Sequence, residues 1–201
     1  HLPRIARRQR QMCIRDRLHN TLAALRQEYP SALVILGAGA EHLATLIATI
    51  NNWTMCGDER AIVEILDPRY FFAGLDKLAI PYPATLFTGP QQSSSWLTKT
   101  VRSCGGMGVM RNCQSAADDG QHYWQQEVQG VPISVLCLAQ SAKVFRIGIN
   151  RQFVNNSLSE QHPFIFAGLY ANYQTDSTIE STVDSYSARI ASYFNYSGIF
   201  S

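Results

Sequence analysis

A lysine-bearing strand, a glycine-rich turn and a second strand follow one another in the middle of this chain, and their order restricts its fold more than any other feature. Residues 96–100 (WLTKT) predict a short strand that carries Lys99, and the turn after it ends in Gly105-Gly106-Met107-Gly108. Further on, Gln125 to Gly130 leads into a hairpin. Together with the helices predicted on either side, this series indicates an α/β (α+β) fold.

Each part of the series suits a nucleoside triphosphate. Lys99 supplies a compact cation for phosphate oxygens. A glycine turn has no side chains to hold a triphosphate away, and its N–H groups can point at phosphate. The segment from Gln125 to Gly130 would join two subdomains, and such a segment can offer backbone groups to the edge of adenine. The amide of Gln125 would lie nearby, and the side chain of Val128 would cover one face of the ring. We therefore expect ATP as the ligand.

The turn alone does not specify this ligand, because a lone Gly-Gly-x-Gly is more often a tight connection between strands. It is not a P-loop, since no Gly-Lys-Ser/Thr follows it, and it is not a kinase loop, since GxGxxG is absent. The hypothesis depends on the order of the parts.

The first third of the chain predicts a strand, a turn and two helices. Residues 32–36 (ALVIL) indicate a buried strand, and the apolar residues from Leu43 to Ile50 recur at helical spacing after a turn at residues 37–39. Asp67-Pro68 begins a further helix, with Asp as the N-cap and Pro at the first position. Proline at residue 81 ends it.

After residue 84 the pattern changes to short strands. Residues 132–139 and 143–150 predict a hairpin, and residues 151–163 predict a polar loop. A last helix is expected over residues 177–194, with Ser177 and Glu180 as a capping box.

The basic charge of the chain is confined to its first residues. The sequence has 17 Lys and Arg against 15 Asp and Glu, but residues 1–17 hold six Arg and one Asp. Without them 11 basic and 14 acidic residues remain, a net charge of −3. An arginine-rich arm can bind nucleic acid or serve in targeting. The run QMCIRDR is similar to translated adapter sequence, however, so we interpret residues 1–17 as a non-native tail and expect no nucleic-acid partner.

The remaining composition excludes several other classes of protein. The five Cys include no CxxC pair, so they indicate neither a disulfide framework nor a zinc site, and they favour a reducing, cytoplasmic location. The five His show no ligand spacing, and we predict no metal site. No apolar run reaches the roughly 18 residues that cross a bilayer, so we expect no membrane association.

These motifs together resemble the ATP-grasp superfamily. The family has a helix that ends in a Gly-Ile-Pro-x-Pro-like segment, matched by residues 79–83, then a strand lysine and a Gly-Gly-x-Gly loop, and then a polar pair, an apolar residue and Gly at a hinge. The run VQGVPISVLCLA resembles the uncharacterised ATP-dependent carboligase branch related to biotin carboxylase. By this resemblance, residues 67–201 are an ATP-grasp domain, and residues 18–66 are the remnant of the Rossmann-like domain that precedes it.

The resemblance also implies roles for single residues. Lys99 would contact the α and β phosphates, and the flexible lid over them would consist of Gly105, Gly106 and Gly108. Adenine would be held by Gln125, Gln126 and Val128. Arg69 lies near a position where the family often has a second phosphate-binding lysine.

Two departures from the family pattern bear on activity. Pro132 stands where many relatives have a ribose-binding Glu, so the ribose contact is unassigned. The family's Mg²⁺ ligands follow the last helix, and we expect them to be missing here, because the sequence stops at Ser201. Asp176, Glu180 and Asp184 are interpreted as helix charges rather than ligands.

Three functions stay open at this point. The first is the ATP-binding portion of a ligase that phosphorylates an unidentified carboxylate for attack by an amine or similar nucleophile, with a homodimer as an open oligomeric state. The second is a non-catalytic ATP-binding or interaction module. The third is an NAD(P)-dependent Rossmann oxidoreductase, because Gly37-Ala38-Gly39 follows a predicted strand, although His42 replaces the third glycine of that motif.

Overall fold

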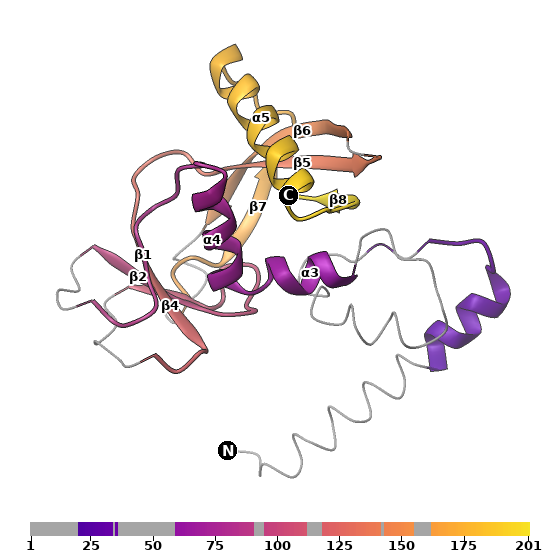
Figure 1. Cartoon of the computed structure of the whole chain (residues 1–201), viewed down its shortest axis with the longest axis horizontal. Coiled ribbons are helices and arrows are strands. Elements are labelled where there is room, and N and C mark those ends of the chain that lie inside the picture. The colour runs from indigo at the N-terminus through magenta and orange to yellow at the C-terminus, as the bar shows by residue number, and fades with distance from the viewer. Residues whose placement is uncertain are drawn as a thin grey trace, which may run out of the picture.

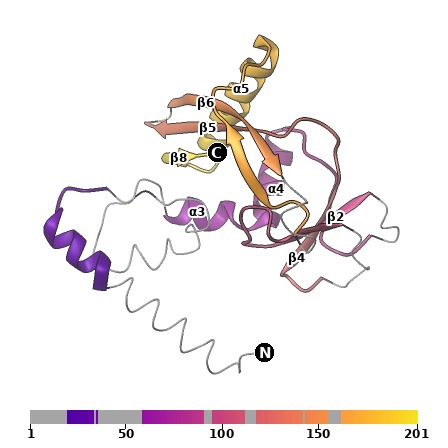
Figure 2. The same cartoon turned by 180° about the vertical axis from the view of Figure 1, so that it is seen from behind.

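The computed structural model describes residues 20–33, 35, 59–90, 95–111, 118–141, 143–154 and 162–201. Within these ranges two four-stranded antiparallel sheets lie on opposite sides of helix α4, Pro68–Lys77 (Figures 1 and 2). This mixture of helices and sheets confirms the predicted α/β (α+β) class. The tail at residues 1–17, the predicted turn at residues 37–39 and the predicted helix at residues 43–50 lie outside the described residues.

The strand predicted over residues 32–36 is wrong for the residues that the structure describes. Residues 20–28 form a helix, and Ala32, Leu33 and Ile35 lie in no strand. The side chains of Leu33 and Ile35 are 61% and 58% exposed. A buried strand needs a hydrogen-bonded neighbour, and every described strand begins after residue 84 and pairs within one of the two sheets.

Helices α3 (Glu59–Ile65) and α4 follow one another closely, and the predicted start of α4 is confirmed. The Asp67 side chain accepts a hydrogen bond from the Arg69 N–H at 2.9 Å, and Pro68 occupies the first turn. The helix ends at Lys77, ahead of the prolines at residues 81 and 83. Helix α3 was not predicted.

The sheet on one side of α4, here called the N-terminal sheet, is built from the strands around the glycine turn. Its strands are β1 (Thr85–Leu86), β2 (Trp96–Thr100), β3 (Val109–Arg111) and β4 (His122–Gln126), in the order β1-β4-β2-β3. Strand β2 has the bounds that the sequence predicts. Because β2 pairs with both β3 and β4, Lys99 lies in the interior of the sheet.

The second sheet, here called the C-terminal sheet, contains the predicted hairpin. Its strands are β5 (Ile133–Gln140), β6 (Lys143–Val154), β7 (Phe166–Tyr170) and β8 (Gly198–Phe200), in the order β7-β6-β5-β8. Strand β6 continues through residues 151–154, which the sequence predicts as loop, because β7 pairs with them.

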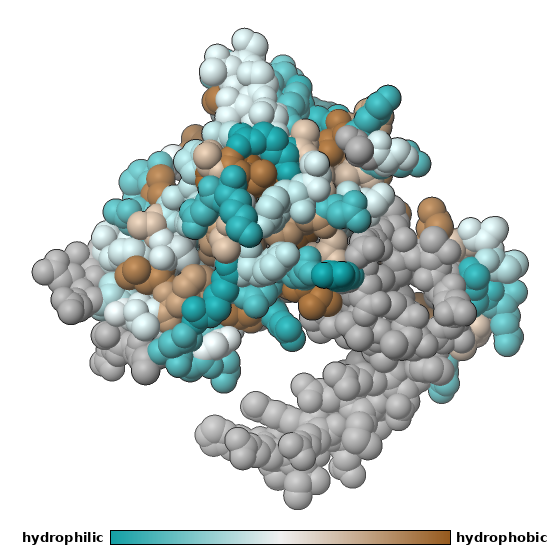
Figure 3. Space-filling model, in the orientation of Figure 1, coloured by the Kyte–Doolittle hydropathy of each residue, from teal (hydrophilic) through white to brown (hydrophobic). Residues whose placement is uncertain are grey.

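Helix α5 (Ser177–Tyr193) covers one face of the C-terminal sheet and joins it to α4. Its N-cap is Asp176, which accepts a hydrogen bond from Ile179 N–H at 2.9 Å, so the predicted cap at Ser177 is one residue late. Phe194 is 4% exposed and stacks on Phe71 of α4, with 5.8 Å between the centres of the two rings. On the face shown in Figure 3, apolar side chains form several patches separated by polar ones.

Candidate functional site

A cavity of about 530 Å³ lies beside α4, β2, β4 and the glycine turn. It brings together four residues of the predicted site, namely Lys99, Gly105, Gly106 and Gln125. Apolar cover comes from α4 through Phe71, Phe72 and Leu75. None of the described residues that line it is Asp or Glu. The cavity therefore has an apolar wall and a cationic wall, an arrangement that suits an anionic ligand with an apolar part.

Lys99 is half-buried, and its orientation is fixed by Gln125. The ammonium donates a hydrogen bond to Gln125 Oε1 at 2.6 Å, and Gln125 Nε2 donates to Thr85 Oγ1 at 3.0 Å. Burial lowers the pKa of Lys99, because desolvation disfavours the charged form. Tyr123, which pairs with Lys99 across the sheet, has its pKa raised for the same reason.

The glycine turn contacts the C-terminal sheet as well as the cavity. Gly105 and Gly106 have φ values of +61° and +75°, which glycine adopts without steric cost. The Phe166 N–H donates a hydrogen bond to Gly105 O at 2.9 Å. A Cβ added to Gly106 would lie 2.6 Å from the Phe164 carbonyl carbon and closer still to its oxygen. The turn thus bridges the two sheets.

Gly108 lies outside the lining of the cavity and is buried. A Cβ at this position would lie 2.9 Å from Thr100 Cβ and would overlap the side chain of Ser103. Close packing within the turn is therefore a structural reason for this glycine.

The hinge residues have different surroundings. Gln126 N–H donates to Ala84 O at 2.9 Å and Glu127 N–H donates to Ser95 O at 2.8 Å, so both N–H groups are occupied. No described residue accepts a hydrogen bond from Val128 N–H, and the Val128 side chain is 66% exposed. Neither Gln126 nor Val128 lines the cavity.

Arg111, the last residue of β3, links this hinge to the segment before β7. Its guanidinium makes an ion pair with Glu127, which raises the pKa of Arg111 and lowers the pKa of Glu127. It also lies 4.7 Å from the centre of the Phe164 ring. Arg111 therefore contacts the same segment before β7 that the glycine turn contacts.

Arg69 lies apart from Lys99. Its guanidinium pairs with Asp118 and sits 4.1 Å from the centre of the Phe87 ring, at a neighbouring cavity that Thr100 and Arg102 also line. The structure therefore does not place Arg69 in the cavity with Lys99.

One cation beside Lys99 was not among the predicted site residues. Arg102 lines both cavities, and among the described residues no hydrogen bond or ion pair reaches its side chain. Its backbone has φ +63°, in a turn directly after β2. The signal in the sequence was its place three residues after Lys99, at the start of the glycine turn.

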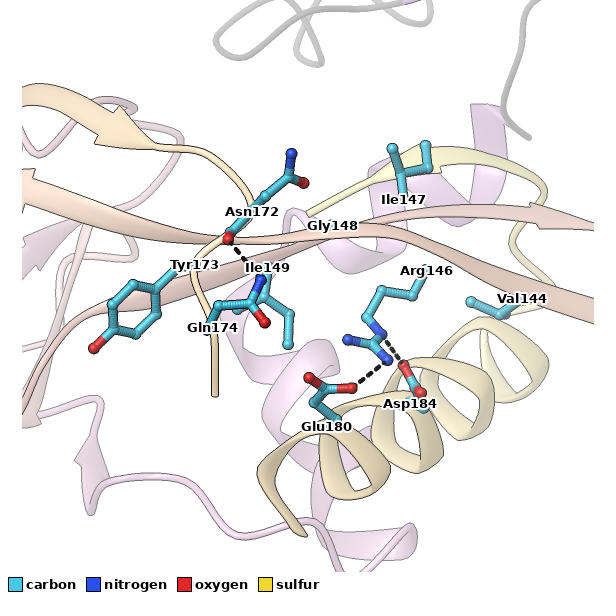
Figure 4. A pocket seen from close by; sticks show the side chains of 10 residues that line it. All are labelled: Val144, Arg146, Ile147, Gly148, Ile149, Asn172, Tyr173, Gln174, Glu180 and Asp184. Atoms are coloured by element: carbon cyan, nitrogen blue, oxygen red, sulfur yellow. Dashed lines mark hydrogen bonds and ion pairs between the residues drawn. The ribbon is translucent and has the colours of Figure 1, made fainter. Parts of the chain in front are cut away.

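A separate polar cavity of about 410 Å³ lies at α5 and β6 (Figure 4). Arg146 makes ion pairs of 2.9 Å with both Glu180 and Asp184, which explains these two helix charges. In the part of the chain that the structure describes, no group of three or more His, Cys, Asp or Glu side chains could hold a metal ion. No helix among these residues is both long and apolar enough to cross a membrane.

Comparisons with known proteins place these observations in a family. The ATP-grasp domain family matches residues 67–199. Similar solved structures include the biotin carboxylase domain of 2-oxoglutarate carboxylase from Hydrogenobacter thermophilus (TM-score 0.66, 12% identity, 90% of this chain and 46% of that chain). VanG D-Ala:D-Ser ligase from Enterococcus faecalis is similar over 83% of this chain and 57% of its own (TM-score 0.63, 12% identity).

L-amino acid ligase from Bacillus licheniformis is also similar (TM-score 0.61, 12% identity, 90% of this chain and 46% of that chain). This chain thus spans about half the length of these structures. A sequence comparison with curated proteins finds no match.

Proposed function

Because this chain belongs to the ATP-grasp family, we propose that it binds ATP in the cavity around Lys99 as the nucleotide-binding portion of an ATP-dependent ligase. The cavity itself carries this proposal. A half-buried ammonium with a neutral partner lies beside a glycine turn and Arg102, and no described lining residue is a carboxylate. Two cations without a competing anion favour a triphosphate.

The hydrogen-bonding groups of Lys99, Gln125 and Val128 support a position for adenine at the hinge. Lys99 uses one of its three N–H donors on Gln125, which leaves two for phosphate oxygens. The unpaired Val128 N–H offers a donor to the adenine edge. The side chain of Gln125 is occupied by Lys99 and Thr85, so the hinge backbone is the better candidate for reading adenine.

The proposed reaction has two steps. A carboxylate oxygen attacks the γ-phosphorus of ATP, the bond to the bridging oxygen breaks, and ADP and an acyl phosphate form. An amine or similar nucleophile then attacks the acyl carbon, the bond from that carbon to the phosphate oxygen breaks, and the nucleophile gives up its proton to solvent. Such chemistry depends on positioning and charge stabilisation, which the Lys99 cavity would supply to the triphosphate. Mg²⁺ offsets charge in phosphoryl transfer. The described residues include no group of ligand side chains that could hold this ion, so no step is assigned to it.

The proposal is tested by titrating ATP into the protein by calorimetry. Lys99→Ala should weaken ATP binding by about tenfold to about a hundredfold, because charge-assisted hydrogen bonds contribute about 1.5–3 kcal/mol. Lys143→Ala is the matched control, since Lys143 is an exposed lysine at the β5–β6 turn. Equal ATP affinity in the wild type and Lys99→Ala, with both folded, would refute the phosphate role.

The two other functions give different results in matched assays. Trapping the acyl phosphate with hydroxylamine across a panel of carboxylates yields a hydroxamate only if the chain phosphorylates an acid. A hydroxamate would therefore exclude a non-catalytic module. Thermal stabilisation by NAD(P) rather than ATP would favour an oxidoreductase.

A further inference from the structure

We propose that Thr85 is a positioning residue for Lys99 and acts through the side-chain amide of Gln125. This inference rests on the proposed function, in which Lys99 binds the triphosphate. Thr85 lies on β1, Gln125 on β4 and Lys99 on β2, so three adjacent strands of the N-terminal sheet contribute one side chain each.

A continuous series of hydrogen bonds connects these residues. Lys99 Nζ donates to Gln125 Oε1 at 2.6 Å, and Gln125 Nε2 donates to Thr85 Oγ1 at 3.0 Å. Thr85 Oγ1 donates in turn to the carbonyl of Pro83 at 2.9 Å. The series therefore begins at a backbone carbonyl and ends at the ammonium group.

The direction of every bond in the series is determined by chemistry. An ammonium group has only donors, so the atom of Gln125 that faces it has to be the oxygen. The amide nitrogen then faces Thr85, which can accept because its hydroxyl proton is directed at the Pro83 carbonyl. By accepting from the amide nitrogen, Thr85 thus supports the amide orientation that presents an acceptor to Lys99.

Burial makes the hydrogen bond between Gln125 and Thr85 important for the orientation of the amide. Gln125 is 8% exposed, so its amide has little access to water. Without the Thr85 hydroxyl, the Nε2 group would lose its partner, and the amide would no longer be held with its oxygen towards the ammonium. A buried amide left without a partner is unfavourable, and a flipped amide would place two donors against each other.

The charges around Lys99 make the orientation matter for ligand binding. The charged or titratable groups that line its cavity with it are Arg102, Cys104, Tyr82 and Tyr123, and no described carboxylate is among them. The amide oxygen therefore supports the ammonium without neutralising it. A carboxylate in its place would attract the ammonium and compete with phosphate.

The test compares ATP affinity in two substitutions at residue 85. Thr85→Val removes the hydroxyl and keeps the shape, whereas Thr85→Ser keeps the hydroxyl. ATP titrations should show a loss of about fivefold to about thirtyfold for Thr85→Val, and a change of less than about twofold for Thr85→Ser. Thermal unfolding without ATP confirms that each variant is folded.

The pH dependence of ATP affinity distinguishes positioning from general damage. ATP affinity is to be measured as a function of pH, from neutrality up to the ordinary pKa of lysine, about 10.4. Thr85→Val should move the midpoint to lower pH, because the ammonium loses a fixed acceptor. Gln125→Glu should move it to higher pH, because a carboxylate stabilises the charged form.

The outcomes separate this inference from the proposed function. If the wild type binds ATP in a Lys99-dependent way but Thr85→Val leaves both affinity and midpoint unchanged, the inference is overturned and the function stands. If Thr85→Val does not fold, an unchanged midpoint in Gln125→Glu overturns the inference instead. If the wild type does not bind ATP at all, the proposed function falls and the inference with it.

Discussion

Replacing Gly106 with alanine is expected to destabilise the protein by an amount that the geometry of the glycine turn specifies. Two unfavourable effects combine at this residue. The φ of +75° costs an alanine about 1–2 kcal/mol. The added Cβ would also lie 2.6 Å from the Phe164 carbonyl carbon, so the turn has to move away from the segment before β7.

The displacement has its own cost. Moving the turn breaks the hydrogen bond from Phe166 N–H to Gly105 O, which contributes about 0.5–1.5 kcal/mol. The expected loss for Gly106→Ala is therefore about 1.5–3.5 kcal/mol in the free energy of unfolding, the sum of the two contributions. For a chain of this length, about 1 kcal/mol shifts Tm by about 2–4 °C.

Gly105→Ala is the matched control, because only one of the two effects applies to it. Its φ is +61°, and an added Cβ would meet no atom within 4 Å. We expect a loss of about 1–2 kcal/mol, the conformational part alone. The lower entropy of the unfolded chain favours alanine equally at both positions, so it cancels in the difference.

The assay is urea unfolding followed by tryptophan fluorescence, with both variants measured beside the wild type. Gly106→Ala should be less stable than Gly105→Ala by about 0.5–1.5 kcal/mol, the contribution of the broken hydrogen bond. Equal stabilities would show that the turn does not pack against Phe164 in solution. A wild-type stability in Gly106→Ala would refute the reasoning on the backbone conformation as well.

Two further predictions concern the buried aromatic side chain of Phe194 and the carboxylate of Asp119. Phe194→Ala should lower the free energy of unfolding, measured with urea, by about 3–5 kcal/mol, because Phe194 is 4% exposed. Tyr193→Ala removes a side chain that is 36% exposed and should cost less than half as much. Equal losses would contradict the assignment of Phe194 to the core. The hydrogen bond from His122, together with the Gln121 N–H, lowers the pKa of Asp119, so its stabilising contribution is full above the ordinary carboxyl pKa and is lost as pH falls through the lowered value. NMR titration should show the pKa of Asp119 rising in His122→Ala, and an unmoved carboxyl pKa would contradict this.

Local signals in the sequence predicted the elements that depend on local chemistry. Asp67-Pro68 marked the start of α4 because a cap and a pre-set φ act within one turn. Residues 96–100 gave β2 with its observed bounds. The ATP-grasp prediction, which came from the order of lysine, glycine turn and hinge, is confirmed by the family match over residues 67–199.

Elements that depend on distant partners were predicted less well. Residues 151–154 open a segment that the sequence predicts as a polar loop, yet they extend β6 because β7 pairs with them. Residues 32–36 are apolar and resemble a buried strand, yet Ala32, Leu33 and Ile35 lie in no strand, and Leu33 and Ile35 are exposed. In both cases pairing decided the outcome, and pairing is not a property of the segment itself.

The same distinction applies to the candidate site. The sequence identified Lys99 and the glycine turn by residue type, but it assigned the Gln125 side chain to adenine. In the structure that side chain lies between Lys99 and Thr85, and Thr85 is 40 residues away in the chain. No spacing rule connects these positions, because the contact exists only once β1 and β2 pair on either side of β4.

The glycine turn shows why a loss of function at a glycine would not by itself identify a phosphate loop. Gly106 is required for contact with Phe164 whether or not a ligand binds, since that contact lies between two parts of the protein. Lys99 is different, because its ammonium touches Gln125 and leaves two donors directed at no described residue. A variant at Gly106 thus reports on how the sheets are joined, and a variant at Lys99 reports on what the cavity binds. Only the second kind of measurement can establish ATP as the ligand, and the Thr85 variants extend it without altering the turn.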